Sequence, residues 1–345
     1  MPPARISVVM PNYNHGRFIA QALEALFAQT RPADEIIVID DASTDDSLRI
    51  IDGLAASRPA VSIVRKGMRG GALATLNEGL DRASGELIAF PAADDLLRPA
   101  FLEEAARLLE RFPEAPFCSA CVELIDGEGR RLGGRPILRP MLTPGYASAE
   151  MARSMLARGD NFFLGPVTLY RRARLVELGG FDPSLGAGTD GMMLRRMAVR
   201  WGFCFTPKVL GAWRLHGANY SAAAVATPER LDRLIQANRR VIEAEPDGLF
   251  PRGYARLFER RLRFNAARLP LSRPGDGTCE DERLGAVLGM IRATRIDGMM
   301  LRAFRHLGPA SSLLSLGWLA LRLRPFSFAW LAAEACRRLV SGRAL

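Results

Sequence analysis

Apolar runs and helically spaced apolar positions alternate along the first third of the chain. Four short runs rich in β-branched residues predict buried strands, and the stretches between them repeat apolar residues every three or four positions, which predicts helices. The predicted strands are Ile6–Met10, ended by Pro11, and Glu35–Ile39, Val61–Val64 and Leu87–Phe90. The predicted helices are Arg17–Gln29, Ser43–Leu54, Ala72–Ala83 and Leu102–Phe112. This alternation predicts a parallel sheet with helices on both faces.

The pattern loosens after residue 115 and becomes helical after residue 227. Between these points, the predicted strands are Phe117–Ile125, Val167–Tyr170 and Val209–Arg214, and the predicted helices are Ala149–Ala157 and Met192–Arg200. Further helices are predicted over 229–244, 252–268 and 280–304, followed by two short apolar stretches. We therefore predict an α/β domain over residues 1–227, with a mainly parallel or mixed sheet, and a helical C-terminal region over residues 228–345.

Positive charge is concentrated in the C-terminal region. The net charge of the chain is +10; residues 1–227 hold 26 Arg and Lys against 25 Asp and Glu, whereas residues 228–345 hold 21 Arg against 12 Asp and Glu. A basic region indicates an anionic partner. Because zinc-finger spacing, an RRM signature and basic–aromatic interleaving are all absent from the sequence, we favour a membrane surface over nucleic acid.

The five cysteines do not form a disulfide or zinc pattern. They are irregularly spaced, and Met1–Arg5 leads directly into a strand with no secretory signal. We therefore expect reduced thiols and a cytoplasmic protein. Cys118 and Cys121 form a CxxC inside an apolar run, and the sequence has no second pair to complete a zinc site.

Polar clusters follow three of the predicted strands. They are Asn12-Tyr13-Asn14, Asp40-Asp41 and Asp94-Asp95. Because ligands of such sheets bind beyond the carboxyl ends of the strands, these clusters predict one site. The second acidic pair suits a hard cation such as Mg²⁺ or Mn²⁺, and Asp41 could accept a hydrogen bond from a nucleobase imide or a ribose hydroxyl. Helix capping is the alternative for both acidic pairs.

Three further residues are candidates for chemistry. Asp190 begins a predicted helix, where a negative charge is favourable and where a simple cap would look the same. His216 follows a predicted strand and is a candidate metal ligand or diphosphate contact, although a lone histidine is more often structural. Lys66 could contact phosphate or belong to a solvated loop. His15 and His306 have no supporting context and are interpreted as surface residues.

Six segments together resemble the family 2 glycosyltransferases with the GT-A fold. They occur in the order of that family over roughly residues 5–221: SVVMPNYNHGRFIAQAL, EIIVIDDASTDDS, GGALATLNEGLDRASGELIAFPAADDLLRP, GGFDPSL, TDGMMLRRMAVRWG and AWRLHGANYS. The resemblance implies a Rossmann-like GT-A domain. It also implies transfer of a sugar from a nucleotide-sugar donor, with UDP the expected nucleotide, to an acceptor hydroxyl with inversion.

The resemblance implies roles for individual residues. The donor-nucleotide residues are Pro11, Asn12, Tyr13, Asn14, Asp41, Asn77, Asp94 and Asp95. Tyr13 is expected near the base and Asp41 bonded to it. Asp94 and His216 are implied as ligands of Mn²⁺ or Mg²⁺, and Asp190 as the catalytic base. The residues implied on the acceptor or diphosphate side are Arg196, Trp213 and His216.

Two positions depart from the family pattern. Ala92 stands where the first Asp of the DxD element is usual, and Thr189 stands where Glu usually precedes the catalytic Asp. These departures support one alternative, a non-catalytic nucleotide-sugar or glycan-binding protein. A nucleotidyltransferase is disfavoured because PNYNHGRF is not a glycine-rich basic phosphate loop, and a dehydrogenase because no GxGxxG follows an early strand.

The C-terminal region combines short apolar runs with aromatic and basic residues. Neither 311–324 nor 325–340 reaches the length needed to span a bilayer. Trp318, Phe326, Phe328 and Trp330 lie in sequence beside Arg322, Arg324, Arg337 and Arg338. This combination predicts attachment to the inner face of the cytoplasmic membrane, with packing on the catalytic domain or a dimer partner as an equal alternative. The expected acceptor is a glycan or a lipid-linked glycan of the cell envelope.

Overall fold

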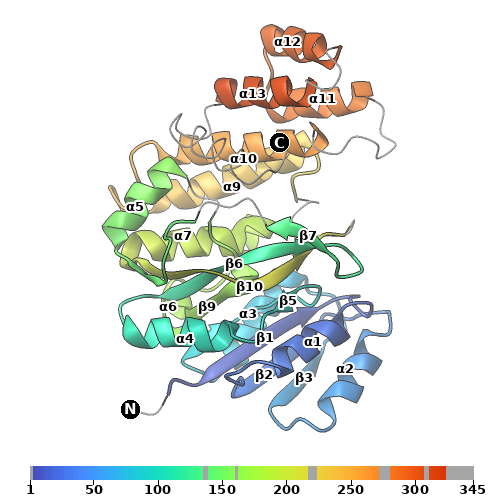
Figure 1. Cartoon of the computed structure of the whole chain (residues 1–345), viewed down its shortest axis with the longest axis vertical. Helices are drawn as coiled ribbons and strands as arrows, with labels where there is room; N and C mark the ends of the chain where they lie inside the picture. The colour runs from blue at the N-terminus through green and yellow to red at the C-terminus, as the bar shows by residue number, and fades with distance from the viewer. Residues whose placement is uncertain are drawn as a thin grey trace. The chain divides into compact units, whose positions relative to one another are not determined.

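The chain consists of two compact units (Figure 1). The structure, a computed structural model, describes residues 3–134, 139–159, 162–216, 224–271, 280–306 and 311–323. Unit 1 comprises residues 1–155 and 160–219, and unit 2 comprises residues 156–159 and 220–345. The end of the α/β domain at residue 227, which the sequence indicates, stays a prediction.

A mixed sheet runs through unit 1. Its strands follow the order β3-β2-β1-β4-β9-β6-β10-β5, and β7 and β8 pair with β6 and β10 respectively. The strands are β1 (Ile6–Asn12), β2 (Glu35–Asp40), β3 (Val61–Arg65), β4 (Leu87–Ala89), β5 (Leu96–Leu97), β6 (Phe117–Ile125), β7 (Arg131–Gly134), β8 (Gly145–Ala147), β9 (Thr168–Arg171) and β10 (Phe203–Arg214). Strands β3, β2, β1 and β4 are parallel, whereas β9 is antiparallel to both β4 and β6.

Two strand boundaries differ from the prediction by more than one residue. Strand β1 does not end at Pro11 but continues through Asn12, with Pro11 in register with Ile39 of β2. Strand β10 begins at Phe203 rather than at Val209, because it also pairs with β8 near its start. The bulges in its pairing with β6 between Thr206 and Gly211 interrupt the alternation of apolar residues, so the sequence pattern shows only the second half of the strand.

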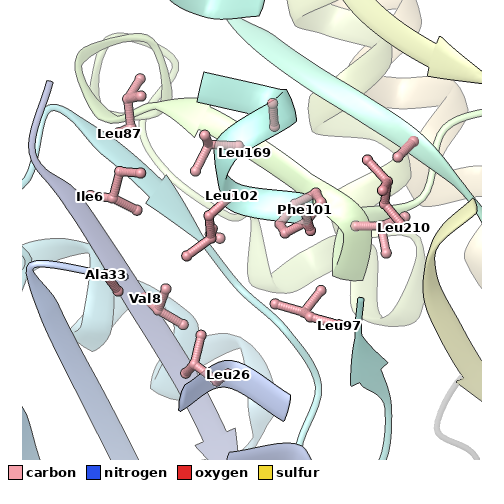
Figure 2. Close-up of a cluster of buried hydrophobic side chains, with 14 of the residues drawn as sticks. Ile6, Val8, Leu26, Ala33, Leu87, Leu97, Phe101, Leu102, Leu169 and Leu210 are labelled. Carbon is pink, nitrogen blue, oxygen red and sulfur yellow. The ribbon is translucent and has the colours of Figure 1, made fainter. Parts of the chain in front are cut away.

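The helices of unit 1 cover the sheet. They are α1 (Ile19–Phe27), α2 (Ser47–Ala55), α3 (Ala72–Arg82), α4 (Phe101–Arg111), α5 (Ala149–Arg158, whose last residues belong to unit 2), α6 (Arg172–Glu177) and α7 (Thr189–Trp201), with 3₁₀ turns η1 (Gly165–Val167) and η2 (Pro183–Gly188). Figure 2 shows the core that α1 and α4 form with the sheet; its members include Ile6, Val8, Leu26, Phe101, Leu102 and Leu169.

Helix α3 packs on the opposite face of β1. Val8 belongs to the core shared with α1 and α4, and Val9 points to the other face because side chains alternate along a strand. The backbone of α3 approaches Val9 so closely that a Cβ at Gly79 would lie 2.2 Å from its Cγ1. Helices therefore cover both faces, which confirms the predicted α/β architecture.

Unit 2 is helical, as predicted, with its own apolar core. Its helices are α9 (Pro228–Ala244), α10 (Tyr254–Leu271), α11 (Glu280–Met290), α12 (Arg295–Arg305) and α13 (Ser311–Leu323). The single helix predicted over 280–304 is wrong, because the chain breaks at Arg292, which has a left-handed φ of 49°, and restarts at Thr294. Thr294 and Asp297 form a capping box that begins α12.

None of the helices in the described ranges is both long enough and apolar enough to cross a membrane. The predicted apolar stretch 325–340 lies outside the described residues, as do Arg324, Cys279 and Cys336. Cys118 and Cys121 are both buried in β6, and their spacing of three places them on opposite faces of the strand. Burial raises the pKa of both thiols, so the CxxC is a core feature.

Candidate functional site

The carboxyl ends of three neighbouring parallel strands meet at one edge of the sheet. Strand β1 lies between β2 and β4, so the segments that follow these strands are neighbours. Asn12 ends β1, Asp40 ends β2, and Asp94 follows β4. The buried Asn12 side chain donates from Nδ2 to Asp40 Oδ2 (2.7 Å) and to Ser43 Oγ (3.1 Å). These bonds hold the two strand ends together just before Asp41.

Asp41 accepts three hydrogen bonds around the segment that follows β3. Lys66 Nζ and the Gly70 N–H donate to Oδ1 (2.9 and 2.8 Å), and the Gly71 N–H donates to Oδ2 (2.7 Å). Burial acts to raise the pKa of Asp41, but these hydrogen bonds outweigh it and lower the pKa below the ordinary value of 3.8. Because each carboxylate oxygen has two lone pairs, Asp41 Oδ2 can accept one further donor.

Tyr13 lies beside the same loop. The Arg69 guanidinium carbon is 4.0 Å from the centroid of the Tyr13 ring, a cation–π contact. The next residue, Asn14, has a left-handed φ of 54°, and its Oδ1 accepts a hydrogen bond from the Thr44 N–H at 2.8 Å. Since Arg69 and Gly70 are adjacent, Tyr13 and Asp41 contact neighbouring residues of one loop, and the two predicted base-binding residues lie close together.

Asp94 and His216 form a pair across the sheet edge. Asp94 Oδ2 and His216 Nε2 are 2.8 Å apart, and both side chains are largely buried. Asp94 follows β4, whereas His216 lies two residues beyond the end of β10, so the fold joins positions 122 apart in the sequence. The structure therefore brings together the two residues predicted as metal ligands.

A fully buried arginine holds the turn that carries Asp94 and Asp95. The Arg214 N–H donates to Asp95 Oδ1, and its Nε donates to the Asp94 carbonyl, both at 2.8 Å. The same guanidinium donates to Gln21 Oε1 at 2.8 Å and to the Gly127 carbonyl at 3.1 Å. Burial, together with the charge of Asp94, raises the pKa of Asp95 well above its ordinary value. Asp95 is thus a structural support for Asp94.

His15 lies beside His216, whereas its sequence context predicted only a surface residue. The His15 and His216 ring centroids are 6.3 Å apart at an interplanar angle of 79°, and Phe18 contacts both rings. The sequence carries no signal for this proximity, because β10 must reach the site before the two histidines can meet.

Asp190 lies in the first turn of α7, as predicted. Its Oδ1 accepts a hydrogen bond from the Gly191 N–H at 2.7 Å, and its other oxygen lies against Gly165, where a Cβ would approach Oδ2 to 2.3 Å. Gly165 precedes β9, which is antiparallel to β4. Gly165 and Asp190 therefore lie toward the sheet edge at which β4 ends and the segment leading to Asp94 begins.

The two departures from the family pattern occupy different environments. Ala92 is half-buried, and its carbonyl accepts a hydrogen bond from the Asp95 N–H at 3.3 Å, which closes the turn that presents Asp94. Thr189 is buried, and its hydroxyl has no hydrogen-bond partner among the described residues. The glutamate usual at that position would thus have to place a charge in the interior.

Three predicted site residues have structural partners. The Asn77 amide exchanges two hydrogen bonds of 2.8 Å with the backbone of Phe181. Arg196 Nη1 donates to the Leu178 carbonyl at 3.4 Å, and Trp213 is half-buried against the unit 1 core. The ligand roles of these side chains stay predictions.

The donor set of Asp94 and His216 fits a metal that is shared with a substrate. Over the ranges that the structure describes, no group of three or more His, Cys, Asp or Glu side chains is arranged to hold an ion. One carboxylate and one imidazole are too few for a site made by the protein alone. Hard divalent cations often bind through one or two protein groups and complete their coordination with substrate phosphates and water.

Comparison with known proteins agrees with this architecture. Residues 7–176 match Glycosyl transferase family 2. An uncharacterized glycosyltransferase of Nostoc sp. is 30% identical over 236 residues, which cover 66% of this chain and 70% of that protein. The poly(ribitol-phosphate) beta-N-acetylglucosaminyltransferase TarS of Staphylococcus aureus is 27% identical over 175 residues, which cover 50% of this chain and 28% of that protein. The chain belongs to glycosyl transferase family 2 and is a glycosyltransferase.

Solved structures show the same fold. Residues 1–349 of S. aureus TarS, in complex with UDP-GlcNAc, superpose with a TM-score of 0.60 at 18% identity, covering 93% of this chain and 90% of that one. The mannosyltransferase PcManGT from Pyrobaculum calidifontis, in complex with GDP-Man and Mn²⁺, gives a TM-score of 0.56 at 25% identity, covering 97% and 87%. The predicted GT-A fold is confirmed.

Proposed function

We propose that the protein transfers a sugar from a UDP-sugar to an acceptor hydroxyl, with inversion at the anomeric carbon. The observation that supports this donor is the hydrogen bonding of Asp41, which retains capacity for one more donor on Oδ2. Uracil presents a single imide N–H at its pairing edge. Guanine presents two adjacent N–H donors there, and cytosine presents a ring acceptor that a carboxylate would repel. Asp41 therefore favours uracil or thymine, which carries the same imide N–H, over guanine and cytosine.

Asp190 is the base that we propose for the acceptor. Its place in the first turn of α7 favours the ionised carboxylate, and Gly165 leaves space for it. In the proposed reaction, Asp190 takes the proton of the acceptor hydroxyl while that oxygen bonds to the anomeric carbon from the face opposite the diphosphate. The bond between the anomeric carbon and the diphosphate oxygen breaks, and UDP leaves with the electron pair.

Asp94 and His216 are the residues that we propose to hold Mn²⁺ or Mg²⁺. A bound ion would neutralise the negative charge that develops on the departing diphosphate. Arg214 and Asp95 keep Asp94 in place through the contacts described above. Arg196 and Trp213 are proposed contacts on the acceptor and diphosphate side.

The names of two relatives support the acceptor class that we propose. Both are named as poly(ribitol-phosphate) glycosyltransferases, one with glucosyl and one with N-acetylglucosaminyl transfer. We propose a polysaccharide-type or lipid-linked glycan acceptor of the cell envelope for this chain. The cytoplasmic location stays a prediction.

The proposed donor is tested by thermal stability against UDP, GDP, CDP and dTDP, each with and without Mn²⁺. A ligand that binds the folded state raises the melting temperature. We expect UDP to give the largest shift and Mn²⁺ to enlarge it. A larger shift with GDP or CDP would overturn the Asp41 argument. A folded protein that responds to none of the four, and that neither hydrolyses nor transfers a nucleotide sugar, would support the non-catalytic alternative.

We also propose that unit 2 binds an anionic membrane surface. Helix α12 exposes Ile296 (62%) and Met299 (69%) on one face, and the exposed Arg295 and Arg302 flank them. On α13, Leu321 is 65% exposed and lines a hollow with Arg260, Trp318 and Arg322. Exposed apolar side chains between arginines match the boundary between lipid headgroups and acyl chains.

Vesicle sedimentation tests this membrane proposal. The protein should sediment with vesicles containing phosphatidylglycerol and stay in solution with phosphatidylcholine alone. Replacing both Ile296 and Met299 by Ser should release it, whereas the matched control in unit 1, Leu142→Ser with Met151→Ser, should not. Equal sedimentation of the two double variants would show that α12 does not bind lipid.

A further inference from the structure

The two histidines of unit 1 lie in contact with one aromatic ring at the edge where Asp94 is held. Phe18 has its ring centroid 5.1 Å from that of His216 and 6.5 Å from that of His15. The His216 ring is fixed by Asp94, whose Oδ2 lies 2.8 Å from Nε2. His15 is half-buried as a residue, so part of it is exposed to solvent. The pair therefore presents two imidazoles next to the acidic turn.

Hydrogen bonds fix the backbone on both sides of His15. The His15 carbonyl accepts hydrogen bonds from the N–H groups of Phe18 and Ile19, both at 2.8 Å, and so opens α1. The preceding Asn14 N–H donates to Ser43 Oγ at 2.9 Å.

The residue after His15 is held in the same way, because the Gly16 N–H donates to Asp45 Oδ2 at 2.8 Å. A Cβ at position 16 would lie 2.9 Å from that oxygen, so glycine is needed for this close approach. Asp45 also accepts from the Ser47 N–H at 3.0 Å, which anchors the carboxylate to the start of α2. His15 is thus presented from a rigid loop.

We infer that His15 is a binding residue for the diphosphate of the donor. This inference rests on the proposed function, in which Asp94 and His216 hold the metal that meets the same diphosphate. A neutral imidazole carries one N–H donor, and phosphate oxygens accept such bonds. The His15 and His216 ring centroids are 6.3 Å apart. A diphosphate bound at Asp94 and His216 would therefore bring its oxygens close to His15. The nucleoside, bound at Tyr13 and Asp41, would not need this contact.

The test compares the dissociation constants of UDP and uridine by calorimetry at fixed Mn²⁺, for wild type, His15→Ala and His15→Gln. We expect His15→Ala to weaken UDP binding about fivefold, which corresponds to one hydrogen bond of about 1 kcal/mol, and to leave uridine binding unchanged. His15→Gln keeps an N–H donor and should recover part of the loss. His306→Gln changes the exposed histidine of unit 2 and serves as the matched control, with no effect expected on either ligand.

Two other outcomes would overturn the inference, and they are distinguishable. If the wild-type protein bound neither UDP nor uridine, both the proposed function and the proposed role of His15 would be wrong. Wild-type binding of UDP, with His15→Ala weakening UDP and uridine equally or not at all, would leave the proposed function intact and remove only the diphosphate role. The melting temperature of each unliganded variant shows that it is folded before binding is compared.

Discussion

At the scale of single residues, the missing side chain of Gly165 decides where Asp190 can lie. A Cβ at position 165 would lie 2.3 Å from Asp190 Oδ2, a distance that real Cβ atoms essentially never show, and 3.0 Å from the Asp190 Cβ. The first turn of α7 has little freedom to retreat, because the neighbouring Thr189 is buried. The carboxylate would therefore have to move.

Gly165→Ala is expected to lower the rate of sugar transfer about a hundredfold, because a shift of about 1 Å in a catalytic group has an effect of that order. UDP binding should be retained. Gly53→Ala is the matched control, since a Cβ at that position meets nothing within 4 Å. Steady-state kinetics with the donor found by the nucleotide screen would measure both variants. Unchanged transfer by Gly165→Ala would argue against Asp190 as the base.

Asp190→Asn removes the proposed base while keeping the shape of the side chain. We expect transfer to fall about a hundred- to ten-thousandfold, the range typical of a general base, with little change in the UDP dissociation constant. Single-turnover transfer and calorimetry report the two quantities separately. If UDP binding were lost with activity, Asp190 would belong to the donor site and another base would be needed.

Local sequence patterns can point to candidate site residues, but not to the residues that hold them in place. Asp41, Asp94 and Asp190 follow buried strands or begin a helix, and such positions can be found from local patterns. Arg214 could not be found in this way, because its hydrogen-bond partners, which include Asp94, Asp95 and Gln21, become neighbours only after β10 joins the sheet. The same reason applies to His15.

At the scale of elements, the junction of α12 and α13 depends on one buried carboxylate. Asp297 accepts hydrogen bonds from the Thr294 N–H (2.8 Å), Trp318 Nε1 (3.0 Å) and Arg322 Nε (3.3 Å). Burial acts to raise the pKa of Asp297, but these donors and the charge of Arg322 lower it below 3.8. The apolar periodicity of 280–304 continues across the break before α12, so periodicity alone could not reveal this joint.

Asp297→Asn should destabilise unit 2 by about 1.5–3 kcal/mol at neutral pH, the range for hydrogen bonds to a charged group. Because the folded-state pKa is lowered, the contribution of the carboxylate is complete above pH 3.8 and is lost as the pH falls through the folded-state value. Urea unfolding of both proteins across this range would show their difference shrinking in acid. The exposed Asp247→Asn is the control, and a difference independent of pH would contradict the assignment.

At the scale of the whole molecule, charge and chemistry are divided along the chain. All the candidate site residues belong to unit 1, including the residues at the strand ends, Asp190, His15 and His216. The net charge of this part of the sequence is close to zero, whereas the excess of arginine lies in the helical region. The alternation of strands and helices predicted the α/β fold, whereas the domain boundary at residue 227 stays a prediction. The antiparallel direction of β9 and the short strands β5 and β8 could not be predicted, because their pairing partners are distant in sequence.

The excess of arginine in the helical region predicts that binding to anionic vesicles depends on the salt concentration. If arginines of the helical region attract anionic vesicles, raising the salt from about 0.1 M to about 1 M should release most of the bound protein, since the screening length falls from about 10 Å to about 3 Å. The melting temperature with saturating UDP serves as the control for folding over the same range. Sedimentation that is indifferent to salt would assign the attachment to apolar contacts alone.

Arg214 holds the turn that carries Asp94 and Asp95. This turn therefore cannot take its final form during synthesis until the ribosome has added Arg214. The ribosome adds Arg214 119 residues after Asp95, which at about 5–20 residues per second is roughly ten seconds later. During that interval the nascent chain already contains Tyr13, Asp41 and the loop around Lys66, but the acidic turn has neither its arginine nor His216. A newborn chain thus carries the groups proposed to bind the base before it can build the part of the site proposed to face the diphosphate.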